Sequence, residues 1–556
     1  MQTVRRLYVY LLSGITLGFL IYGLITLVEV ALSALGVGGG GIDGRREQLS
    51  VAAALIGVGL PVWAIHWWFA ERGLDPNRPN AEEERSSTVR ALYLTVVMIV
   101  LLSVGAFAAR DLVREFVLGF LPRPQDDFYG YSSGSAARSL ATLFVTGAAW
   151  GYHVAVRRRD LARGPLEGAA AWLPRLYVYG ATLTGLMITL QAFGDLARYA
   201  GETLWPISGT DYTGDYRSYA FAESLSLFAV WTIGWIGHWW YAGRLLIAAG
   251  WRASSERAAR LRLAFFVSVI LAGAFSVIRL TAEAARAVLI PVLDATDAIG
   301  GNLGATDLVR AVVVALVSAV PWAVAWWLHQ RWMHEEALEA DDPSREAVAA
   351  RLDLHSVALV GLAFAAVGTG WLVGLLIDVA LGGSRTVGGS GFWRAELANF
   401  VPFTLIGLGV WVWRWWPIQA RHQADPAAEA ASTIRRSFLL VILAASVITS
   451  LGSLAYVLYR LFGSLLGANL GGGGVLELSM PIGALLAAGG VALYHGLALR
   501  RDLALRAAIE PEAPVVMPVA ERSRRSLVLF GPPDGDSDAA LGALREALPP
   551  GFTLDE

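Results

Sequence analysis

Four histidines recur near the ends of long apolar segments, and they are the strongest candidates for chemistry in this sequence: His66, His153, His238 and His495. A neutral imidazole can ligate a haem or a metal ion, line a quinone site or relay protons. Tryptophan flanks three of these histidines, as in Trp63-Ala-Ile-His66-Trp-Trp, and Tyr494 precedes His495. Both aromatic residues favour the membrane–water boundary. We therefore expect interfacial anchoring, with binding of a lipid or quinone headgroup and ligation of haem or metal as the alternatives.

The recurring Trp-x-x-His-Trp-Trp sequence is called the histidine word below, and two of its degenerate copies argue against a ligand role. They read Trp322-x-x-Ala325-Trp-Trp and Trp411-x-x-Arg414-Trp-Trp, and neither alanine nor arginine can replace a histidine ligand. His66 also lies six residues before Arg72, which is about 9 Å of helix and places it near an interface. We expect no catalytic residue, no metal site and no cofactor.

Charged residues late in other apolar segments form a second set of candidates: Arg110, Asp111, Arg114, Asp195, Arg198, Arg279, Glu283, Arg286 and Arg460. Charges inside a membrane segment are functional candidates by default. Asp111 follows Arg90 by 21 residues, or about 30 Å of helix, and so lies at the far interface. We expect local ion pairs on helix ends, with a gate or an outer vestibule as the alternative. Arg279, 17 residues after Arg262, is the deepest of the set.

The histidine word defines an internal repeat. Its key positions are 66, 153, 238, 325, 414 and 495, so successive spacings are 87, 85, 87, 89 and 81. Each unit opens with arginine and an aromatic residue, except the fifth, which reads Arg351-Leu-Asp-Leu-His355. A unit is therefore a helix, a loop, a second helix that ends in the word, and a charged linker. We predict six tandem two-helix repeats in one orientation, unlike the inverted repeats of many transporters: 1–87, 88–172, 173–257, 258–347, 348–431 and 432–503.

A longer period overlies the short one. His153 and His495 are each followed by Arg-Arg-Asp-Leu-Ala, at 158–162 and 500–504, whereas the full His-Trp-Trp word belongs to units one and three. This alternation indicates a four-helix unit copied three times, although unit four fits neither class.

Composition assigns the chain to the membrane proteins. Of the 556 residues, 55% are hydrophobic and 16% charged, whereas about a quarter are charged in soluble domains. Apolar runs of 20 or more residues recur, and crossing a ~30 Å hydrocarbon core takes about 20. The first run, from Leu7 to about Leu35, is too long for a signal peptide. We predict an all-α, polytopic membrane protein with about twelve transmembrane helices.

Residue types that are missing exclude several kinds of site. There is no cysteine, which excludes disulfides, iron–sulfur clusters, thiolate zinc sites and c-type haem. All 44 basic residues are arginine, so a Walker lysine and a Schiff-base lysine are excluded. The net charge of −2 gives no support for nucleic acid as a partner.

Arginine distribution predicts the topology. Twenty-five arginines lie in the linkers between units and at the outer ends of the first and last helices, against eight in the loops inside the units. By the positive-inside rule, we expect a multi-pass membrane protein with both termini and all linkers between units in the cytoplasm. Residues 504–556 then form a cytoplasmic linker and a small α/β-like tail, with a strand at 525–530 and a helix from about 537 to 548.

The Arg-Leu-Tyr-Val-Tyr opening at 6–10 and 175–179 and the His-Trp-Trp close, repeated across residues 4–503, resemble the uncharacterised bacterial membrane family known as domain of unknown function 5671. The resemblance covers about nine-tenths of the chain and implies a bacterial membrane protein, with no activity attached. We expect a non-enzymatic scaffold that interacts with the lipid bilayer and with a membrane-protein partner or a second copy of itself. A transporter or channel is the alternative, and a membrane redox protein with a His-ligated cofactor is the second.

Overall fold

A computed structural model of the chain describes residues 2–37, 42–121, 136–164, 166, 168–206, 214–247, 256–257, 259–295, 304–339, 343–381, 392–467 and 478–509. Its regular structure in these ranges is helical, and twelve of the described helices are long and apolar enough to cross a membrane. These candidate spans are 27 to 38 residues long, more than the ~20 residues that the hydrocarbon core requires. Their ends therefore extend to headgroup depth, where charged side chains are tolerated. The chain is a multi-pass membrane protein, as predicted.

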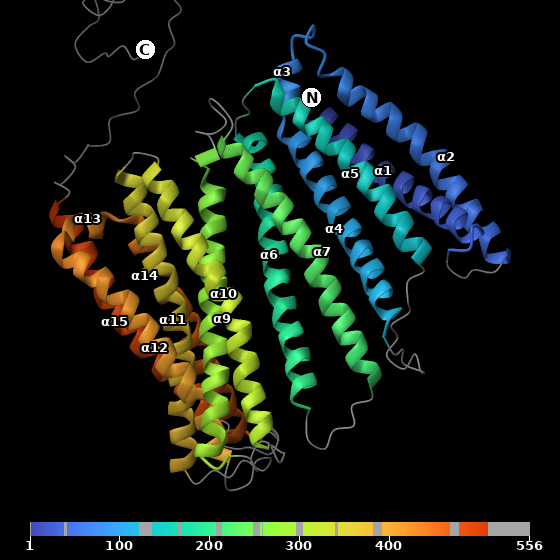
Figure 1. Cartoon of the computed structure of the whole chain (residues 1–556). Helices are drawn as coiled ribbons and strands as arrows, with labels where there is room; N and C mark the ends of the chain where they lie inside the picture. Colours follow the sequence, from blue (N-terminus) through green and yellow to red (C-terminus); the bar gives the residue numbers. More distant parts are fainter. Residues whose placement is uncertain are drawn as a thin grey trace, which may run out of the picture. The chain divides into compact units, whose positions relative to one another are not determined.

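The twelve long helices form six consecutive hairpins (Figure 1). Their bounds are α1 Gln2–Ala34, α2 Ile42–Arg72, α4 Thr88–Leu118, α5 Ala136–Ala162, α6 Gly168–Leu204, α7 Gly214–Ile247, α9 Arg260–Val292, α10 Ala305–Glu339, α11 Pro343–Ala380, α12 Phe392–Ala424, α14 Thr433–Leu465 and α15 Ser479–Ile509. Two short helices, α3 Ala81–Arg85 and α13 Pro426–Ala431, lie in the linkers that follow α2 and α12.

The contacts between hairpins repeat every four long helices, and we group them as module 1 (α1, α2, α4, α5), module 2 (α6, α7, α9, α10) and module 3 (α11, α12, α14, α15). The first helix of each module packs on both helices of the second hairpin: α1 on α4 and α5, α6 on α9 and α10, α11 on α14 and α15. Successive modules join alike, since α4 contacts α6 and α7, and α9 contacts α11 and α12. This pattern supports the four-helix period.

Small residues create the closest helix–helix approaches. Gly370 and Gly374 of α11 face the backbone of α15 near Ala484 and Met480, so the Gly-x-x-x-Gly spacing marks a close contact there. Gly18 of α1 differs, because a Cβ added to it would meet nothing within 4 Å. Gly14, four residues earlier, does face a neighbouring helix, since a Cβ added to it would lie 3.8 Å from the Tyr93 ring of α4.

The chain divides into two compact units, residues 1–503 and 504–556. Of the second unit, the structure describes the end of α15 as far as Ile509. The predicted strand at 525–530 and helix at 537–548 lie outside the described residues. The sites below belong to the first unit.

Candidate functional site

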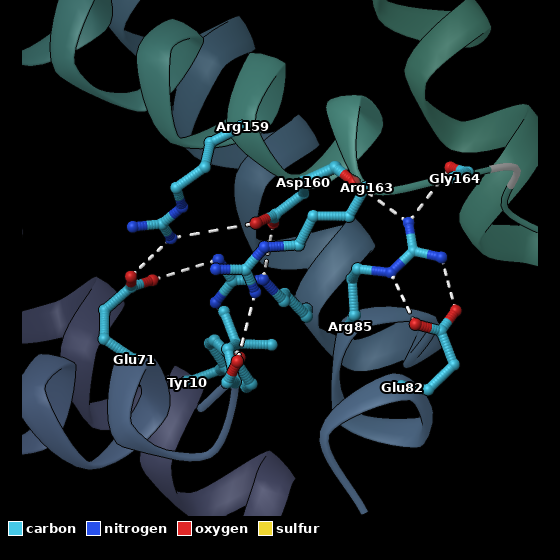
Figure 2. Close-up of polar contacts among 10 residues, drawn as sticks. Tyr10, Glu71, Glu82, Arg85, Arg159, Asp160, Arg163 and Gly164 are labelled. Atoms are coloured by element: carbon cyan, nitrogen blue, oxygen red, sulfur yellow. Dashed lines mark hydrogen bonds and ion pairs between the residues drawn. The ribbon is translucent and has the colours of Figure 1, made fainter. Parts of the chain in front are cut away.

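A buried arginine–carboxylate cluster closes module 1. Arg90, at the start of α4, is fully buried. Its Nε donates to Asp160 Oδ2 at 2.8 Å, its Nη1 to the Tyr10 hydroxyl at 3.1 Å, and its Nη2 to Glu71 Oε1 at 3.0 Å. Figure 2 shows Tyr10, Glu71 and Asp160 converging from three different helices. A guanidinium removed from water is tolerated only when its charge and its donors are matched in this way.

Modules 2 and 3 contain the same cluster. In module 2, Arg262 Nε donates to Glu336 Oε2 at 2.7 Å and its Nη1 donates to the Tyr179 hydroxyl at 2.9 Å. In module 3, Arg435 Nε donates to Asp502 Oδ2 at 2.7 Å. A tryptophan ring lies beside each guanidinium carbon, at 5.7, 5.3 and 5.8 Å: Trp67, Trp239 and Trp415. Within this distance a guanidinium is attracted to an aromatic face.

One histidine precedes the carboxylate of each cluster by seven residues: His153, His329 and His495. Each is 1% exposed, and its Nδ1 lies 2.7–2.9 Å from the backbone carbonyl four residues earlier. A carbonyl only accepts hydrogen bonds, so Nδ1 carries the proton and Nε2 of the neutral ring is an acceptor. His153 Nε2 lies 3.4 Å from the Tyr93 hydroxyl. Among the residues that the structure describes, Nε2 of His329 and of His495 is buried without a hydrogen-bond partner.

His329 was missed by the sequence alignment, which placed Ala325 at the histidine position of unit four. Gly185 packs against Trp235, and Gly361 packs against Trp411. Each of these tryptophans stands three residues before the histidine position of its unit. In unit four the same contact joins Gly273 to Trp326, three residues before His329. The Trp322-x-x-Ala325 alignment was therefore shifted by four residues. The seven-residue spacing from histidine to carboxylate was the signal that could have found His329.

The first hairpin of each module is closed by a different arginine–glutamate pair. Arg6 donates to Glu84 at 2.8 Å, Arg175 to Glu256 at 2.9 Å, and Arg351 to Glu429 at 2.9 Å. Glu84 and Glu429 lie on the short linker helices α3 and α13, which explains why those helices pack against the ends of the long ones.

The remaining candidate histidines pair with tyrosines of their own hairpins. Tyr177 receives a hydrogen bond from Trp150 at 2.7 Å, and its hydroxyl lies 3.0 Å from His238 Nε2. The ring of His66 lies 5.6 Å from that of Tyr8. The four histidines named from the sequence are thus not gathered into one site, and they belong to two structural classes.

Module 3 replaces this tyrosine–histidine pair by an ion pair. Asp353 stands two residues after the opening arginine, where Tyr8 and Tyr177 stand in the other modules, and Arg414 stands in the histidine position. Arg414 Nη1 lies 3.4 Å from Asp353 Oδ2, which also accepts a hydrogen bond from Gln330 at 2.9 Å. Asp353 and Arg414 both differ from the repeated pattern, and we interpret them as one coupled replacement because they lie against each other.

Module 3 also leaves polar atoms of its cluster unmatched. His355 occupies the position of Tyr10 and Tyr179, and its Nδ1 is bound to the Arg351 carbonyl at 2.7 Å. The Nε2 of His355 and the Nη1 of Arg435 are buried and have no hydrogen-bond partner within the described ranges. A tyrosine hydroxyl here would accept from Arg435, as it does from Arg90 and Arg262.

Replacing His355 by tyrosine is expected to stabilise the protein. The new hydroxyl supplies the missing acceptor, and one satisfied buried hydrogen bond contributes about 0.5–1.5 kcal/mol. Thermal unfolding in detergent measures the effect. Tyr179→His in module 2 is the reciprocal control and is expected to lower the unfolding midpoint; a His355→Tyr variant less stable than the wild type would contradict the equivalence of the positions.

Charges near the other ends of the helices are paired mainly with near neighbours. Arg114 Nη2 lies 3.5 Å from Asp111 Oδ1, and Arg279 pairs with Glu283 one turn away. Arg110 and Arg114 both reach Glu223 on α7. A cavity of about 390 Å³ between α6, α9 and α10 is lined by seven charged residues of both signs: Asp195, Arg198, Arg279, Glu283, Arg286, Asp307 and Arg310.

Over part of its length, the chain matches a protein family of unknown function. No curated protein and no solved structure matches the chain. A family model described as a domain of unknown function (DUF5671) matches residues 6–128 and 351–494, just under half of the chain rather than the nine-tenths expected from the resemblance. The two matches begin at Arg6 and Arg351, the arginines that open modules 1 and 3. In these two segments the chain is similar to the family described as domain of unknown function 5671.

Proposed function

We propose that this chain is a non-enzymatic scaffold of the bacterial plasma membrane that binds lipids or a membrane-protein partner. One observation carries the proposal: six arginines that open the helices are each neutralised by a carboxylate from the end of the same hairpin or from the linker after it. Polar groups used in this way fix helices to one another. An acid–base or redox site needs groups that are open to a substrate.

The large exposed side chains are those of a surface that faces lipid or another protein. Ile233 is 74% exposed, Leu376 68% and Trp416 74%. Side chains of this kind on transmembrane helices contact acyl chains or a partner helix. A frame stiffened by internal ion pairs, with an apolar outer surface, suits a protein that positions other membrane components.

Photo-cross-linking in cells tests the scaffold. A photoreactive phenylalanine analogue placed at Ile233, Leu376 or Trp416 is expected to give one discrete protein adduct, or a dimer of this chain, from one face, and lipid adducts from the others. Solute-dependent currents in proteoliposomes of the pure protein, abolished by Glu283→Gln, would instead favour the transporter. That alternative rests on the charged 390 Å³ cavity between α6, α9 and α10.

Both termini are proposed to face the cytoplasm. The asymmetry of 25 arginines against eight supports this orientation. Alkaline phosphatase fused after Glu556 is expected to be inactive, while the same enzyme fused in the loop at 207–213 is expected to be active. The reverse pattern would overturn the topology and leave the helix packing unaffected.

The redox alternative has lost one of its counterarguments. The sequence argument assigned Ala325 to the histidine position of unit four, so that this unit had no histidine. The packing of Gly273 on Trp326 supports His329 as the residue at that position. Arg414 remains a position without histidine, and the Nε2 of His238 lies within hydrogen-bonding distance of Tyr177. Within the described ranges, no group of three or more His, Asp or Glu residues is arranged to hold a metal ion.

A further inference from the structure

A cavity of about 420 Å³ lies between α5, α6 and α7, at the ends of these helices where the charged linkers begin. Four arginines line it: Arg157, Arg158, Arg175 and Arg244. Glu256 is the acidic residue of the lining, and it is already bound by Arg175 at 2.9 Å and by the Tyr179 hydroxyl. The cavity therefore carries an excess of positive charge.

Arg157 is the residue that points to a ligand. It is 8% exposed, and among the described residues it makes no hydrogen bond and no ion pair. The three buried cluster arginines, Arg90, Arg262 and Arg435, each have a carboxylate partner. Asp160, the carboxylate nearest in its effect on Arg157, is already bound by Arg90 at 2.8 Å. A buried cation that forms no ion pair of its own is unfavourable, so an anion in the cavity would supply the partner that Arg157 lacks.

Arg158 and Arg244 add two further cations at the mouth of the cavity. The Arg244 guanidinium lies 3.9 Å from the centre of the Trp240 ring, and that of Arg158 lies 5.9 Å from the Tyr241 ring. In the described part of the chain, neither forms an ion pair. Stacking on aromatic faces orients a guanidinium while its N–H groups remain available to oxygen atoms of a ligand.

The other walls of the cavity are apolar: Leu161, Ala162, Leu166, Ala171, Pro174, Val178 and Leu245. A soluble anion gains nothing from such walls, whereas the glycerol and first acyl carbons of a lipid do. Guanidinium groups match the oxygen geometry of phosphate, and basic pockets between transmembrane helices suit anionic headgroups.

We propose that this cavity binds the phosphate-bearing headgroup of an anionic membrane lipid, with Arg157 as the innermost contact. The proposal deepens the proposed function, because it rests on the chain being a lipid-interacting scaffold and names the class of lipid. Lipid binding would join module 1 to module 2, because α5 is the last helix of module 1 and α6 and α7 form the first hairpin of module 2.

The full-length protein, freed of lipid in a non-ionic detergent, tests the site. Added phosphatidylglycerol is expected to raise the thermal unfolding midpoint and to remain bound in native mass spectrometry, and phosphatidylcholine is expected to do neither. Arg157→Gln is expected to weaken phosphatidylglycerol binding at least tenfold. The same variant should be more stable than the wild type without lipid, because it removes an unpaired buried cation. Arg260→Gln, an exposed arginine outside the cavity, is the matched control and should behave as the wild type.

Each outcome decides one part of the proposal. Equal phosphatidylglycerol binding by the wild type, Arg157→Gln and Arg244→Gln would overturn the site while the lipid-interacting scaffold stands. Stabilisation by inorganic phosphate or glycerol 3-phosphate equal to that by the lipid would assign the cavity to a soluble phosphate. Absence of any lipid effect on the wild type would overturn both the site and the lipid-binding role. Arg244→Gln, which changes an exposed side chain, keeps the test valid if Arg157→Gln does not fold.

Discussion

Replacing Asp160 by alanine is expected to destabilise the protein by about 3–5 kcal/mol, because the fully buried Arg90 then loses its closest carboxylate. Glu71 cannot compensate, since it also pairs with Arg159 and belongs to another helix. The loss should be visible as a lower unfolding midpoint in detergent and as reduced accumulation in the membrane. The cluster is repeated in the molecule, so Glu336→Ala and Asp502→Ala should have effects of similar size.

Two comparisons make this first prediction specific. Glu335 pairs with Arg331 one turn away on α10, and both side chains are exposed, at 46% and 59%, so Glu335→Ala should cost at most about 1 kcal/mol. Replacing both partners, as in Arg90→Met with Asp160→Leu, should recover much of the loss, since a buried ion pair can often be replaced by apolar side chains. An Asp160→Ala variant as stable as Glu335→Ala would show that the cluster does not fix the helices.

In module 3, we expect either single replacement of Asp353 or Arg414 to destabilise the protein, and the double replacement to be tolerated. Asp353→Tyr leaves Arg414 buried without a carboxylate, and Arg414→His leaves Asp353 without its arginine. Each single variant is expected to lose about 3 kcal/mol or more, the scale for breaking a buried ion pair. The double variant recreates the Tyr177–His238 pair of module 2, and the larger tyrosine is offset by the smaller histidine. It should recover most of the stability.

A double-mutant cycle in thermal unfolding measures this coupling, which should be well above the additivity error of about 0.3–0.5 kcal/mol for independent sites. Asp502→Tyr with Arg435→His is the matched control, because no module has that pair in the Arg435 cluster and no recovery is expected. A double variant no more stable than its weaker single variant would mean that Asp353 and Arg414 are not the counterparts of a tyrosine and a histidine elsewhere.

Much of the architecture is readable from the sequence because it depends on local properties. A span is recognised by the length and hydropathy of one continuous segment, so twelve candidate helices follow directly from the apolar runs. The spacing of the Trp/His word also exposed the short period, and the Arg-Arg-Asp-Leu-Ala copies pointed to the four-helix period that the helix contacts support.

The pairing of the charged residues was decided only by the tertiary structure. The partners of the six opening arginines lie 67 to 81 positions further along the chain, so each pair forms because a hairpin brings its two ends together. No local pattern encodes such a contact. In the sequence, Asp160 and Asp502 are recognised only as members of the two Arg-Arg-Asp-Leu-Ala copies. Folding makes them, together with Glu336, the counter-charges of buried guanidinium groups.

The same distinction explains the misplaced residue of unit four and the unrecognised cavity. Trp322 begins a segment with the tryptophans of the word, Trp322-x-x-x-Trp326, whereas Trp326 begins one with its histidine, Trp326-x-x-His329. Only the packing of Trp326 on Gly273 fixes the register that makes His329 the counterpart. Arg157 stands in a run of three arginines that looks uniformly solvent-facing, yet α6 and α7 bury it while Arg158 and Arg159 remain more exposed. The sequence determined which residues carry charge and which segments enter the membrane. Which charges are neutralised and which is left to bind a ligand depends on neighbouring helices, because burial and distance to a counter-charge are properties of the assembled hairpins.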